Sequence, residues 1–401
     1  MRHFDVAIVG TGHGGAQAAI QLRQLGFAGT IALLGREPDL PYERPPLSKD
    51  YLAGARDYDR LLMRPPGFWT ERGIEVLTGR EVVQVDPEAR RLGCAQGEEI
   101  GYRHLIWAAG GVPKRLACPG AELAHVIRSR ADVDRLREAL GTAGRVAVIG
   151  GGYIGLETAA VLRKLGKQVV LLEALDRVLA RVAGEPLSRF VEARHRAEGV
   201  DVRLAATVAA IGKGAVTLAT GEAIACDLAV AGIGIDAAAA PLLAAGAEGG
   251  NGVAVDSFCR TSLAGISAVG DCALHASRWA GGAAIRLESV QNAHDMAAVA
   301  ARDLVGRPEP YEAVPWFWSN QYDLRLQSVG LWLDYDEIVT RGDPATGSFS
   351  LVYLAAGRVI ALDCVNSTRD YAQGRRLVEQ GARLTAPALA DTSRQLKELL
   401  P

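Results

Sequence analysis

One local pattern occurs twice in the sequence. In each copy a short apolar strand ends in glycines spaced G-x-G-x-x-G, and a helical segment follows. The two strands are expected over Phe4–Val9 and Arg145–Ile149. The glycines are Gly10, Gly12 and Gly15 in the first copy, and Gly150, Gly152 and Gly155 in the second. Such a turn lets the backbone approach a pyrophosphate, and the helix N-terminus offers its free N–H groups to the phosphates. The chain is therefore expected to bind two dinucleotides.

The first copy continues as a βαβ unit. Apolar residues recur at helical intervals over Ala16–Leu25, and a second strand is expected over Thr30–Leu34. The acidic residue that usually binds the adenosine ribose is less regular here, because Arg36 precedes Glu37 after this strand. Either Arg36 or Glu37 is expected to lie against the adenosine.

The second copy matches the template more fully. A helical segment over Leu156–Leu165 leads to a strand over Gln168–Leu172, which ends at Glu173. A carboxylate there accepts both ribose hydroxyls of NADH and repels a 2′-phosphate. Ala174 and Leu175 follow, and neither favours a 2′-phosphate. The second motif is therefore expected to bind NADH rather than NADPH.

A flavin and a nicotinamide are the usual pair of dinucleotides on one chain, and a later segment favours FAD as the first. RTSLAGISAVGDCA (Arg260–Ala273) reads as a turn, a short apolar strand and then Asp271. The Asp271 carboxylate is expected to accept a hydrogen bond from the ribityl chain of FAD. The alternative is that Asp271 only caps the following helix.

Bulk properties exclude several classes of partner. The net charge is −2, so there is no general attraction to nucleic acid or to an anionic membrane. The first strand begins at once, without room for a signal peptide, and apolar runs such as Val169–Leu172 are only strand-length. We therefore expect a cytoplasmic protein that does not bind membranes.

Several motifs together give a family resemblance. They are LPYERPPLSKDYL (Leu40–Leu52), AAGGVP (Ala108–Pro113), GGGYIGLE (Gly150–Glu157), AGIG (Ala231–Gly234), AVGDCA (Ala268–Ala273), RLESVQNA (Arg286–Ala293) and PWFWSNQYD (Pro315–Asp323). In this order the chain resembles the NADH-dependent ferredoxin reductases of bacterial oxygenase systems, the group of putidaredoxin reductase and the biphenyl dioxygenase reductase. The resemblance covers nearly the whole chain.

The resemblance implies an α/β fold like that of glutathione reductase, with two Rossmann-like dinucleotide-binding domains and a C-terminal α+β domain. The implied bounds are residues 1–113 and 237–314 for a discontinuous FAD-binding domain, 114–236 for an NAD-binding domain and 315–401 for the C-terminal domain. A relative's proline-containing loop is replaced here by Ile235-Asp236-Ala237-Ala238, which leaves the second crossover loosely defined.

The resemblance also implies site residues. FAD contacts fall on Gly14, Lys49, Val82, Arg128, Asp271, Val290 and Trp318. The matched motifs add Ala109, Tyr153, Ile154 and Gly234 to the cofactor-binding residues. One departure is Arg36, where relatives carry an aspartate, so the adenosine contact differs from theirs.

Three charged residues are expected to serve the chemistry. Reduced flavin is an anion at neutral pH, and a fixed cation beside its ring stabilises it. Lys49 is the candidate cation, held by Glu157 as in the relatives; the alternative is a solvated surface lysine. Glu288 is expected to align the nicotinamide carboxamide, unless it is an ordinary carboxylate at a helix start. None of the three is expected to act as a general acid or base.

The cysteine pattern bears on where the electrons leave. The six cysteines are Cys94, Cys118, Cys226, Cys259, Cys272 and Cys364, and none forms a CxxC pair or has metal-ligand spacing. Glutathione and thioredoxin reductases pass electrons through a disulfide beside the flavin, which this chain lacks. Electrons are therefore expected to go directly to an external acceptor.

A [2Fe–2S] ferredoxin fits as the acceptor, because it takes one electron at a time and is usually acidic. It would supply a monooxygenase or a ring-hydroxylating dioxygenase. Its docking surface is expected among Arg64, Arg278, Arg286, Arg325 and Arg369, with Trp318 and Trp332 nearby. The alternatives are an NADH oxidase or rubredoxin-type reductase, and a redox-responsive binding protein like apoptosis-inducing factor, whose basic surface the net charge does not support.

Overall fold

The computed structural model describes residues 1–400 and divides the chain into two compact units. Unit 1 comprises Met1–Arg44, Tyr58–Val112 and Ile235–Pro315. Unit 2 comprises Pro45–Asp57, Pro113–Gly234 and Trp316–Pro401. Each unit is thus assembled from segments far apart in the sequence. The three-domain division expected from the sequence stays a prediction.

Unit 1 is built on a seven-stranded sheet of order β3-β2-β1-β6-β5-β4, and β19 pairs with the C-terminal end of β6, at Leu105–Trp107. The strands are β1 (Arg2–Val9), β2 (Ile31–Leu34), β3 (Ile74–Leu77), β4 (Val82–Asp86), β5 (Arg91–Cys94), β6 (Glu99–Trp107) and β19 (Ile266–Ala268). β3, β2, β1, β6 and β19 are mutually parallel, whereas β5 is antiparallel to both β4 and β6. All four residues of β2 are buried, as expected for a parallel strand covered on both faces.

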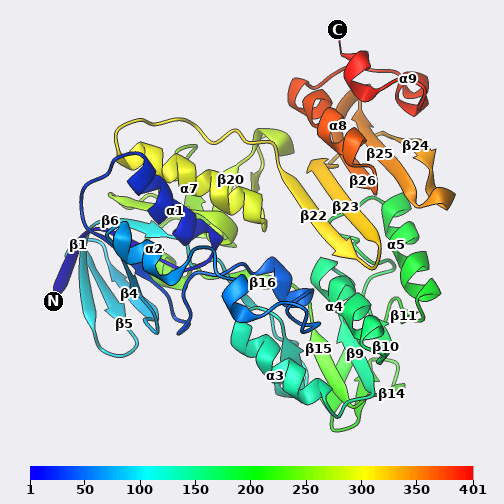
Figure 1. The fold of residues 1–401 in the computed structure, drawn as a ribbon, viewed down its shortest axis with the longest axis horizontal. Coiled ribbons are helices and arrows are strands. Elements are labelled where there is room, and N and C mark those ends of the chain that lie inside the picture. Colours follow the sequence, from blue (N-terminus) through cyan, green and yellow to red (C-terminus); the bar gives the residue numbers. More distant parts are fainter. Residues whose placement is uncertain (401) are drawn as a thin grey trace. The chain divides into compact units, whose positions relative to one another are not determined.

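The helices of unit 1 are α1 (His13–Gln24), α2 (Pro66–Glu71), α6 (Ala240–Ala244) and α7 (Val290–Leu304). α1 and α7 lie side by side, α1 in blue and α7 in yellow (Figure 1). A smaller sheet of order β17-β18-β20-β21 contains β17 (Gly249–Gly250), β18 (Gly252–Val255), β20 (Ala273–Ala276) and β21 (Ala284–Ile285).

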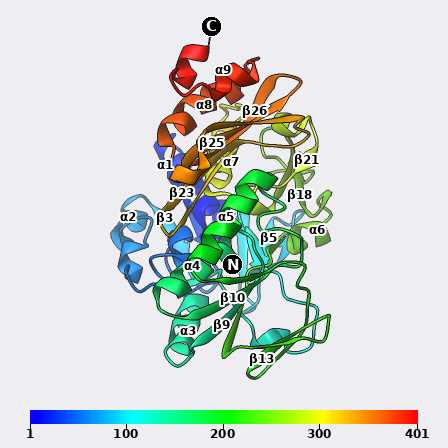
Figure 2. The same ribbon diagram turned by 90° about the vertical axis from the view of Figure 1, so that its right-hand side faces the viewer.

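Unit 2 contains a second parallel sheet, of order β11-β10-β9-β15-β8. Its strands are β8 (His125–Val126), β9 (Arg145–Ile149), β10 (Gln168–Leu172), β11 (Asp201–Arg203) and β15 (Leu228–Ala231). The helices of this region are α3 (Arg130–Leu140), α4 (Tyr153–Lys164) and α5 (Glu185–Ala197). α4 packs on β9 and β10 (Figure 2). α5 packs on β11. A three-stranded sheet, β12 (Val208–Gly212), β13 (Ala215–Leu218) and β14 (Ala223–Ala225), accompanies them.

The C-terminal part of unit 2 is an antiparallel sheet of order β22-β23-β26-β25-β24. Its strands are β22 (Trp316–Gln321), β23 (Leu324–Gly330), β24 (Glu337–Asp343), β25 (Ser348–Ala355) and β26 (Arg358–Val365). α8 (Thr368–Gln380) crosses β26 and β23, and α9 (Ala386–Ala390) contacts β24 (Figure 1). None of the helices in residues 1–400 is both long enough and apolar enough to cross a bilayer.

The crossover that the sequence left loosely defined is an ordered pair of strands. β7 (Gly111–Pro113) pairs with β16 (Ile235–Ala237) where the chain leaves unit 1 and returns to it. The indole of buried Trp107 donates a hydrogen bond to the carbonyl of Ala238 at 2.7 Å. The alanines of this segment are thus fixed by backbone contacts that need no special side chain.

Helix starts differ most from the sequence expectation. The helix expected over Ala16–Leu25 begins at His13, and the one expected over Leu156–Leu165 begins at Tyr153. Glycines within the first turn are poor helix formers, so the apolar periodicity starts later than the helix itself. Strands are closer to expectation, since β9 and β10 have the expected bounds.

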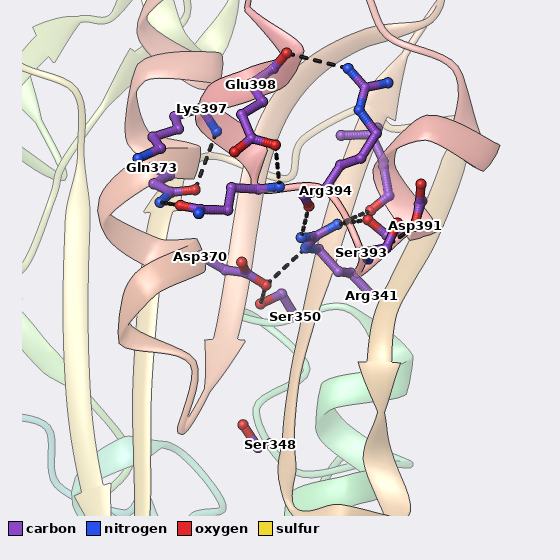
Figure 3. A network of polar contacts seen from close by, with 12 residues as sticks. Arg341, Ser348, Ser350, Asp370, Gln373, Asp391, Ser393, Arg394, Lys397 and Glu398 are labelled. Carbon is purple, nitrogen blue, oxygen red and sulfur yellow. Dashed lines mark hydrogen bonds and ion pairs between the residues drawn. The ribbon is translucent and has the colours of Figure 1, made fainter.

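One buried guanidinium anchors the C-terminal segment to the antiparallel sheet (Figure 3). Arg341 on β24 is 4% exposed, and its Nε donates to the Asp370 carboxylate on α8 at 3.1 Å. Its terminal nitrogens donate to the carbonyls of Leu389, Asp391 and Arg394 at 2.6–3.0 Å. A single side chain therefore satisfies three carbonyls of the last segment, which lacks a large core of its own.

We predict that Arg341→Met loosens the C-terminal segment, because it leaves three carbonyls without their donor and the largely buried Asp370 carboxylate without its cation. Removing one partner of a buried ion pair costs about 3 kcal/mol or more. Hydrogen exchange of residues 386–400 should accelerate by at least about tenfold. Arg375→Met is the matched control, since Arg375 forms only an exposed pair with Glu379 on α8. Equal exchange in the two variants would contradict the prediction.

Candidate functional site

The first glycine motif joins β1 to α1 in a turn that only glycine fits. Gly10 has φ +112°, and a Cβ there would overlap the carbonyl oxygen of Ala108. α1 begins directly after Gly12, with no side chain capping its first N–H groups. Gly14 and Gly15 are buried in its first turn. The start of α1 therefore presents its first backbone N–H groups without a side-chain cap, an arrangement that suits a pyrophosphate.

The second glycine motif repeats this geometry between β9 and α4 in unit 2. Gly150 has φ +107°, and a Cβ there would overlap the carbonyl oxygen of Gly232. Gly155 is buried in the first turn of α4. Gly152, the residue before α4, has no side chain capping the helix, and nothing lies within 4 Å of where its Cβ would be. Both motifs therefore fit the phosphates of a dinucleotide.

The acid after β2 is already engaged. Glu37 accepts hydrogen bonds from the Tyr42 hydroxyl at 2.5 Å and from the Arg44 guanidinium at 2.7 Å. Burial favours the neutral acid, but Arg44 and Tyr42 outweigh it and lower the pKa of Glu37 below its ordinary value. Arg36, the other candidate for the adenosine, is exposed.

Arg44 is a site residue that the sequence analysis missed. Its Nε lies 3.6 Å from the position a Cβ would take on Gly12, and the Asp271 charge also acts on it. A guanidinium over this turn can bind a phosphate bidentately. The only signal in the sequence was an arginine beside the two prolines of the Leu40–Leu52 motif, and spacing gave no reason to prefer it to neighbouring charges.

The acid after β10 holds the second turn closed. Glu173 accepts the N–H of Gly151 at 2.6 Å and the N–H of Leu175 at 2.8 Å. Its carboxylate therefore lies beside the glycine motif, where a ribose would follow the pyrophosphate. The same oxygens that accept these backbone hydrogens are those expected to accept ribose hydroxyls.

Lys49 and Glu157 form the ion pair expected between them. Lys49 Nζ donates to Glu157 Oε2 at 2.6 Å, and the Glu157 side chain is only 2% exposed. Two hydroxyls, those of Ser48 and Ser319, also donate to this carboxylate at 2.6 Å. Lys49 follows the 3₁₀ turn Pro45–Ser48, Glu157 lies on α4 and Ser319 on β22, so three distant segments of unit 2 meet at one carboxylate.

The sequence analysis did not foresee either serine of this cluster. Both are buried, since Ser48 is 1% exposed and Ser319 has no exposed surface. A buried carboxylate needs such donors, because burying a charge without hydrogen bonds is costly. Nothing in the local pattern around Ser319 distinguishes it from an ordinary strand residue.

Asp271 and Glu288 meet at one arginine in unit 1. Arg286 donates to the backbone carbonyl of Asp271 at 2.5 Å and forms an ion pair with Glu288 at 2.9 Å. Asp271 lies in a 3₁₀ turn (Gly270–Cys272) and does not start α7, because Ser289 provides the cap of that helix. Glu288 precedes this cap and is 42% exposed.

The other expected cofactor residues are divided between the units. Unit 1 has Val82 at the start of β4, Ala109 after β6 and Val290 at the start of α7. Unit 2 has Arg128 ahead of α3, Tyr153 and Ile154 at the start of α4, Gly234 after β15 and Trp318 on β22. The Tyr153 ring lies 4.6 Å from that of Phe317, and burial raises the pKa of the Tyr153 hydroxyl.

The thiols and the docking arginines also have defined surroundings. All six cysteines are free, and five are buried, as their small apolar character suggests. Burial raises the pKa of Cys272 to about 11, so it is a thiol and not a thiolate near neutrality.

Four of the five arginines expected at the docking surface are exposed, namely Arg64, Arg278, Arg325 and Arg369. Arg286 is the exception, because its side chain is only 8% exposed and already contacts Glu288 and the carbonyl of Asp271.

Comparison with known proteins places the chain in a family. The family model for pyridine nucleotide-disulphide oxidoreductases matches residues 4–297, and the model for a reductase C-terminal region matches residues 316–400. The 5,5′-dehydrodivanillate O-demethylase ferredoxin reductase subunit of Sphingobium sp. is 58% identical, over 100% of this chain and 99% of its own. A ferredoxin–NAD(P)⁺ reductase of Sphingomonas sp. is 55% identical, over 99% and 98%.

A solved structure agrees with these sequence matches. The covalent complex of putidaredoxin reductase with putidaredoxin contains a chain that is 36% identical, with a TM-score of 0.95 over 99% of this chain and 98% of that one. The likeness confirms the expected fold class, with glutathione-reductase-like dinucleotide-binding domains and a C-terminal reductase domain. The chain therefore belongs to the pyridine nucleotide-disulphide oxidoreductase family, with ferredoxin reductases among its relatives.

Proposed function

We propose that this protein transfers electrons from NADH through FAD to a [2Fe–2S] ferredoxin that supplies an oxygenase or an O-demethylase. The observation that carries the proposal is a chain with two dinucleotide cradles that matches ferredoxin reductases from end to end. Membership of the family implies FAD and NAD(P)H as cofactors. One relative is solved in a covalent complex with putidaredoxin, and the relative from Sphingobium sp. is a subunit of an O-demethylase system.

The division of labour follows from the two cradles. The first glycine motif would hold the FAD phosphates at the start of α1, with Arg44 as an additional cation over Gly12. The second would hold NADH at the start of α4, where it enters and leaves with each turnover. FAD, when bound, accepts two electrons from the nicotinamide and returns them one at a time, which the protein residues themselves do not do.

Lys49 is the residue proposed to stabilise charge on the reduced cofactor. The Glu157 carboxylate restrains its ammonium at 2.6 Å, and the carbonyl of Pro45 accepts from the same nitrogen at 3.2 Å. A cation fixed before reaction costs no reorganisation when negative charge develops. Glu288 is proposed to orient the nicotinamide carboxamide, with its own position set by Arg286.

The exposed arginines supply the attraction for an acidic partner. Arg64 and Arg278 in unit 1 are proposed as cations that attract the partner. Arg325 and Arg369 in unit 2 are proposed to do the same, with Trp318 and Trp332 as partly exposed aromatic contacts. Such charges raise the association rate at low salt and are screened as ionic strength rises. The overall charge of −2 leaves this positive field local.

The first test is an anaerobic stopped-flow experiment in which purified protein is mixed with NADH and then with a [2Fe–2S] ferredoxin. We expect bleaching of a flavin spectrum by NADH, followed by ferredoxin reduction within seconds. Bleaching followed by rapid oxygen consumption, with no transfer to ferredoxin, would replace the proposal with an NADH oxidase. The absence of any flavin spectrum would remove the account of the first glycine motif.

The choice between NADH and NADPH is tested at the acid after β10. Glu173→Gln removes the charge that repels a 2′-phosphate. It retains one oxygen acceptor, so one of the two N–H groups of Gly151 and Leu175 keeps its partner. The ratio of kcat/KM for NADH to that for NADPH should fall by about tenfold, which is about 1.4 kcal/mol. Glu222→Gln, at an exposed carboxylate of the same unit, is the control. An unchanged ratio would show that Glu173 does not select the cofactor.

The role of Lys49 is tested by Lys49→Met. Rate constants for flavin reduction by NADH should fall by at least about tenfold, because the cation that stabilises the product is gone. Lys213→Met is the control, at an exposed lysine between β12 and β13. The double variant Lys49→Met, Glu157→Gln separates the two possible causes. If it restored the rate, the defect would come from the uncompensated buried carboxylate and not from the lost cation.

A further inference from the structure

A continuous line of hydrogen bonds leads away from Glu157 through unit 2. Ser319 donates to Glu157 Oε1 at 2.6 Å, and the Gln321 side-chain amide lies 3.2 Å from the Ser319 hydroxyl. Gln321 Oε1 is 2.9 Å from His195 Nε2, and the Tyr322 hydroxyl is 3.2 Å from His195 Nδ1. The line therefore joins Lys49's partner to α5, through residues that the proposed function does not use.

The charge on Glu157 fixes the direction of every bond in this line. A carboxylate only accepts hydrogen bonds, so the Ser319 hydroxyl must donate its hydrogen to Glu157. The Ser319 oxygen then accepts from the Gln321 amide nitrogen, which leaves the Gln321 carbonyl oxygen facing His195. That oxygen also only accepts, so His195 must carry its proton on Nε2. Nδ1 is left to accept from the Tyr322 hydroxyl.

Burial makes this line selective. His195 and Ser319 have no exposed surface, and Gln321 is 1% exposed, so solvent does not compete for these donors and acceptors. Burial lowers the pKa of His195 to about 4, which leaves the ring neutral near pH 7. A neutral ring with one donor and one acceptor nitrogen is the form that the line requires.

The far end of the line is held in place by charged contacts. Tyr322 has φ +54°, and its ring lies 5.0 Å from that of His195. Arg194, beside His195 on α5, forms an ion pair with Asp323 at 2.9 Å. Lys164 on α4 donates to the Tyr322 carbonyl at 3.3 Å. The turn between β22 and β23 is thus docked on both helices, although its central tyrosine has an unfavourable backbone conformation.

We infer that His195, in its neutral Nε2–H tautomer, is a positioning residue that acts through Gln321 and Ser319 to hold the Glu157 carboxylate, and through it the ammonium of Lys49. The inference rests on the proposed function, because Lys49 matters to the flavin only if FAD is bound. Hydrogen bonds aligned head to tail polarise one another, so loss of the first donor weakens the last bond to Glu157. The same strand, β22, also carries Trp318, so docking of its tip fixes both residues.

The tautomer is tested by NMR of protein labelled with ¹⁵N in its histidine rings. The chain has seven histidines, and the His195 signals are identified as those missing from His195→Gln. We expect a protonated Nε2 and an unprotonated Nδ1 in the wild type. Glu157→Gln can donate to Ser319 and so removes the fixed direction, which should shift the His195 signals toward the other tautomer. Glu185→Gln, at an exposed carboxylate on α5, should leave them unchanged.

Two results of this experiment would overturn the inference. One is an Nδ1–H tautomer or a doubly protonated ring in the wild type at pH 7. The other is a His195 tautomer that does not respond to Glu157→Gln. The NMR experiment measures the protonation of His195 in the hydrogen-bond line directly, and it needs neither NADH nor a ferredoxin.

The effect on Lys49 is tested by the midpoint potential of the bound flavin, measured by dithionite titration against a reference dye. Ser319→Ala and His195→Phe should each lower the equilibrium constant for two-electron reduction by about three- to tenfold, or about 14–30 mV. His195→Gln retains a donor toward Gln321 and should recover most of the wild-type potential. The double variant Ser319→Ala, His195→Phe should fall no further than Ser319→Ala alone, because His195 acts through Ser319.

The remaining outcomes separate the inference from the proposed function. Additive losses in the double variant, or a potential that is unchanged or raised in His195→Phe, would overturn the positioning role. Should His195→Phe not fold, Ser319→Ala and His195→Gln still test the line, since both are small changes. A wild-type flavin that dithionite reduces but NADH does not would overturn the proposed function and leave the positioning role to be judged by the potentials.

Discussion

A single buried carboxylate organises unit 2. Glu157 lies at the end of the second glycine motif and accepts from Ser48 and Lys49 in one segment and from Ser319 in another, so three segments, with its own, meet there. A charge this deeply buried is tolerated only when its oxygens are paired and hydrogen-bonded, so the three segments are required to meet there. The loop before Lys49 and the strand that carries Trp318 are both positioned by this one requirement.

Two kinds of constraint thus act on the chemistry. The glycine cradles are backbone features, in which close approach of Gly10 to Ala108 and of Gly150 to Gly232 leaves no space for a side chain. The Glu157 cluster is a side-chain feature that extends inward to His195. In the proposed function, the first kind would bind phosphates without regard to the rest of the ligand, whereas the second would adjust the charge beside a bound cofactor.

The two Rossmann-like units could be predicted because each is specified by a local sequence pattern. A strand that is apolar on both faces, as over Arg145–Ile149, and a glycine turn before a helix specify a Rossmann-like unit within some thirty residues. The pairing of Lys49 with Glu157 came from the family resemblance, since no local pattern links residues so far apart. The helix starts were misplaced by about a turn, because glycines inside a first turn hide the periodicity.

The sequence by itself determined the two dinucleotide motifs and the absence of a paired disulfide motif, because each depends on residues close together in the chain. The fold class followed from the family resemblance, which extends over nearly the whole chain. Only the tertiary structure placed Arg44 over the first glycine turn, Ser319 on Glu157 and Arg341 on the C-terminal carbonyls. These contacts depend on which buried donors and acceptors are left unpaired once the sheets have packed. That balance of hydrogen bonds is a property of the assembled core and leaves no local pattern in the sequence.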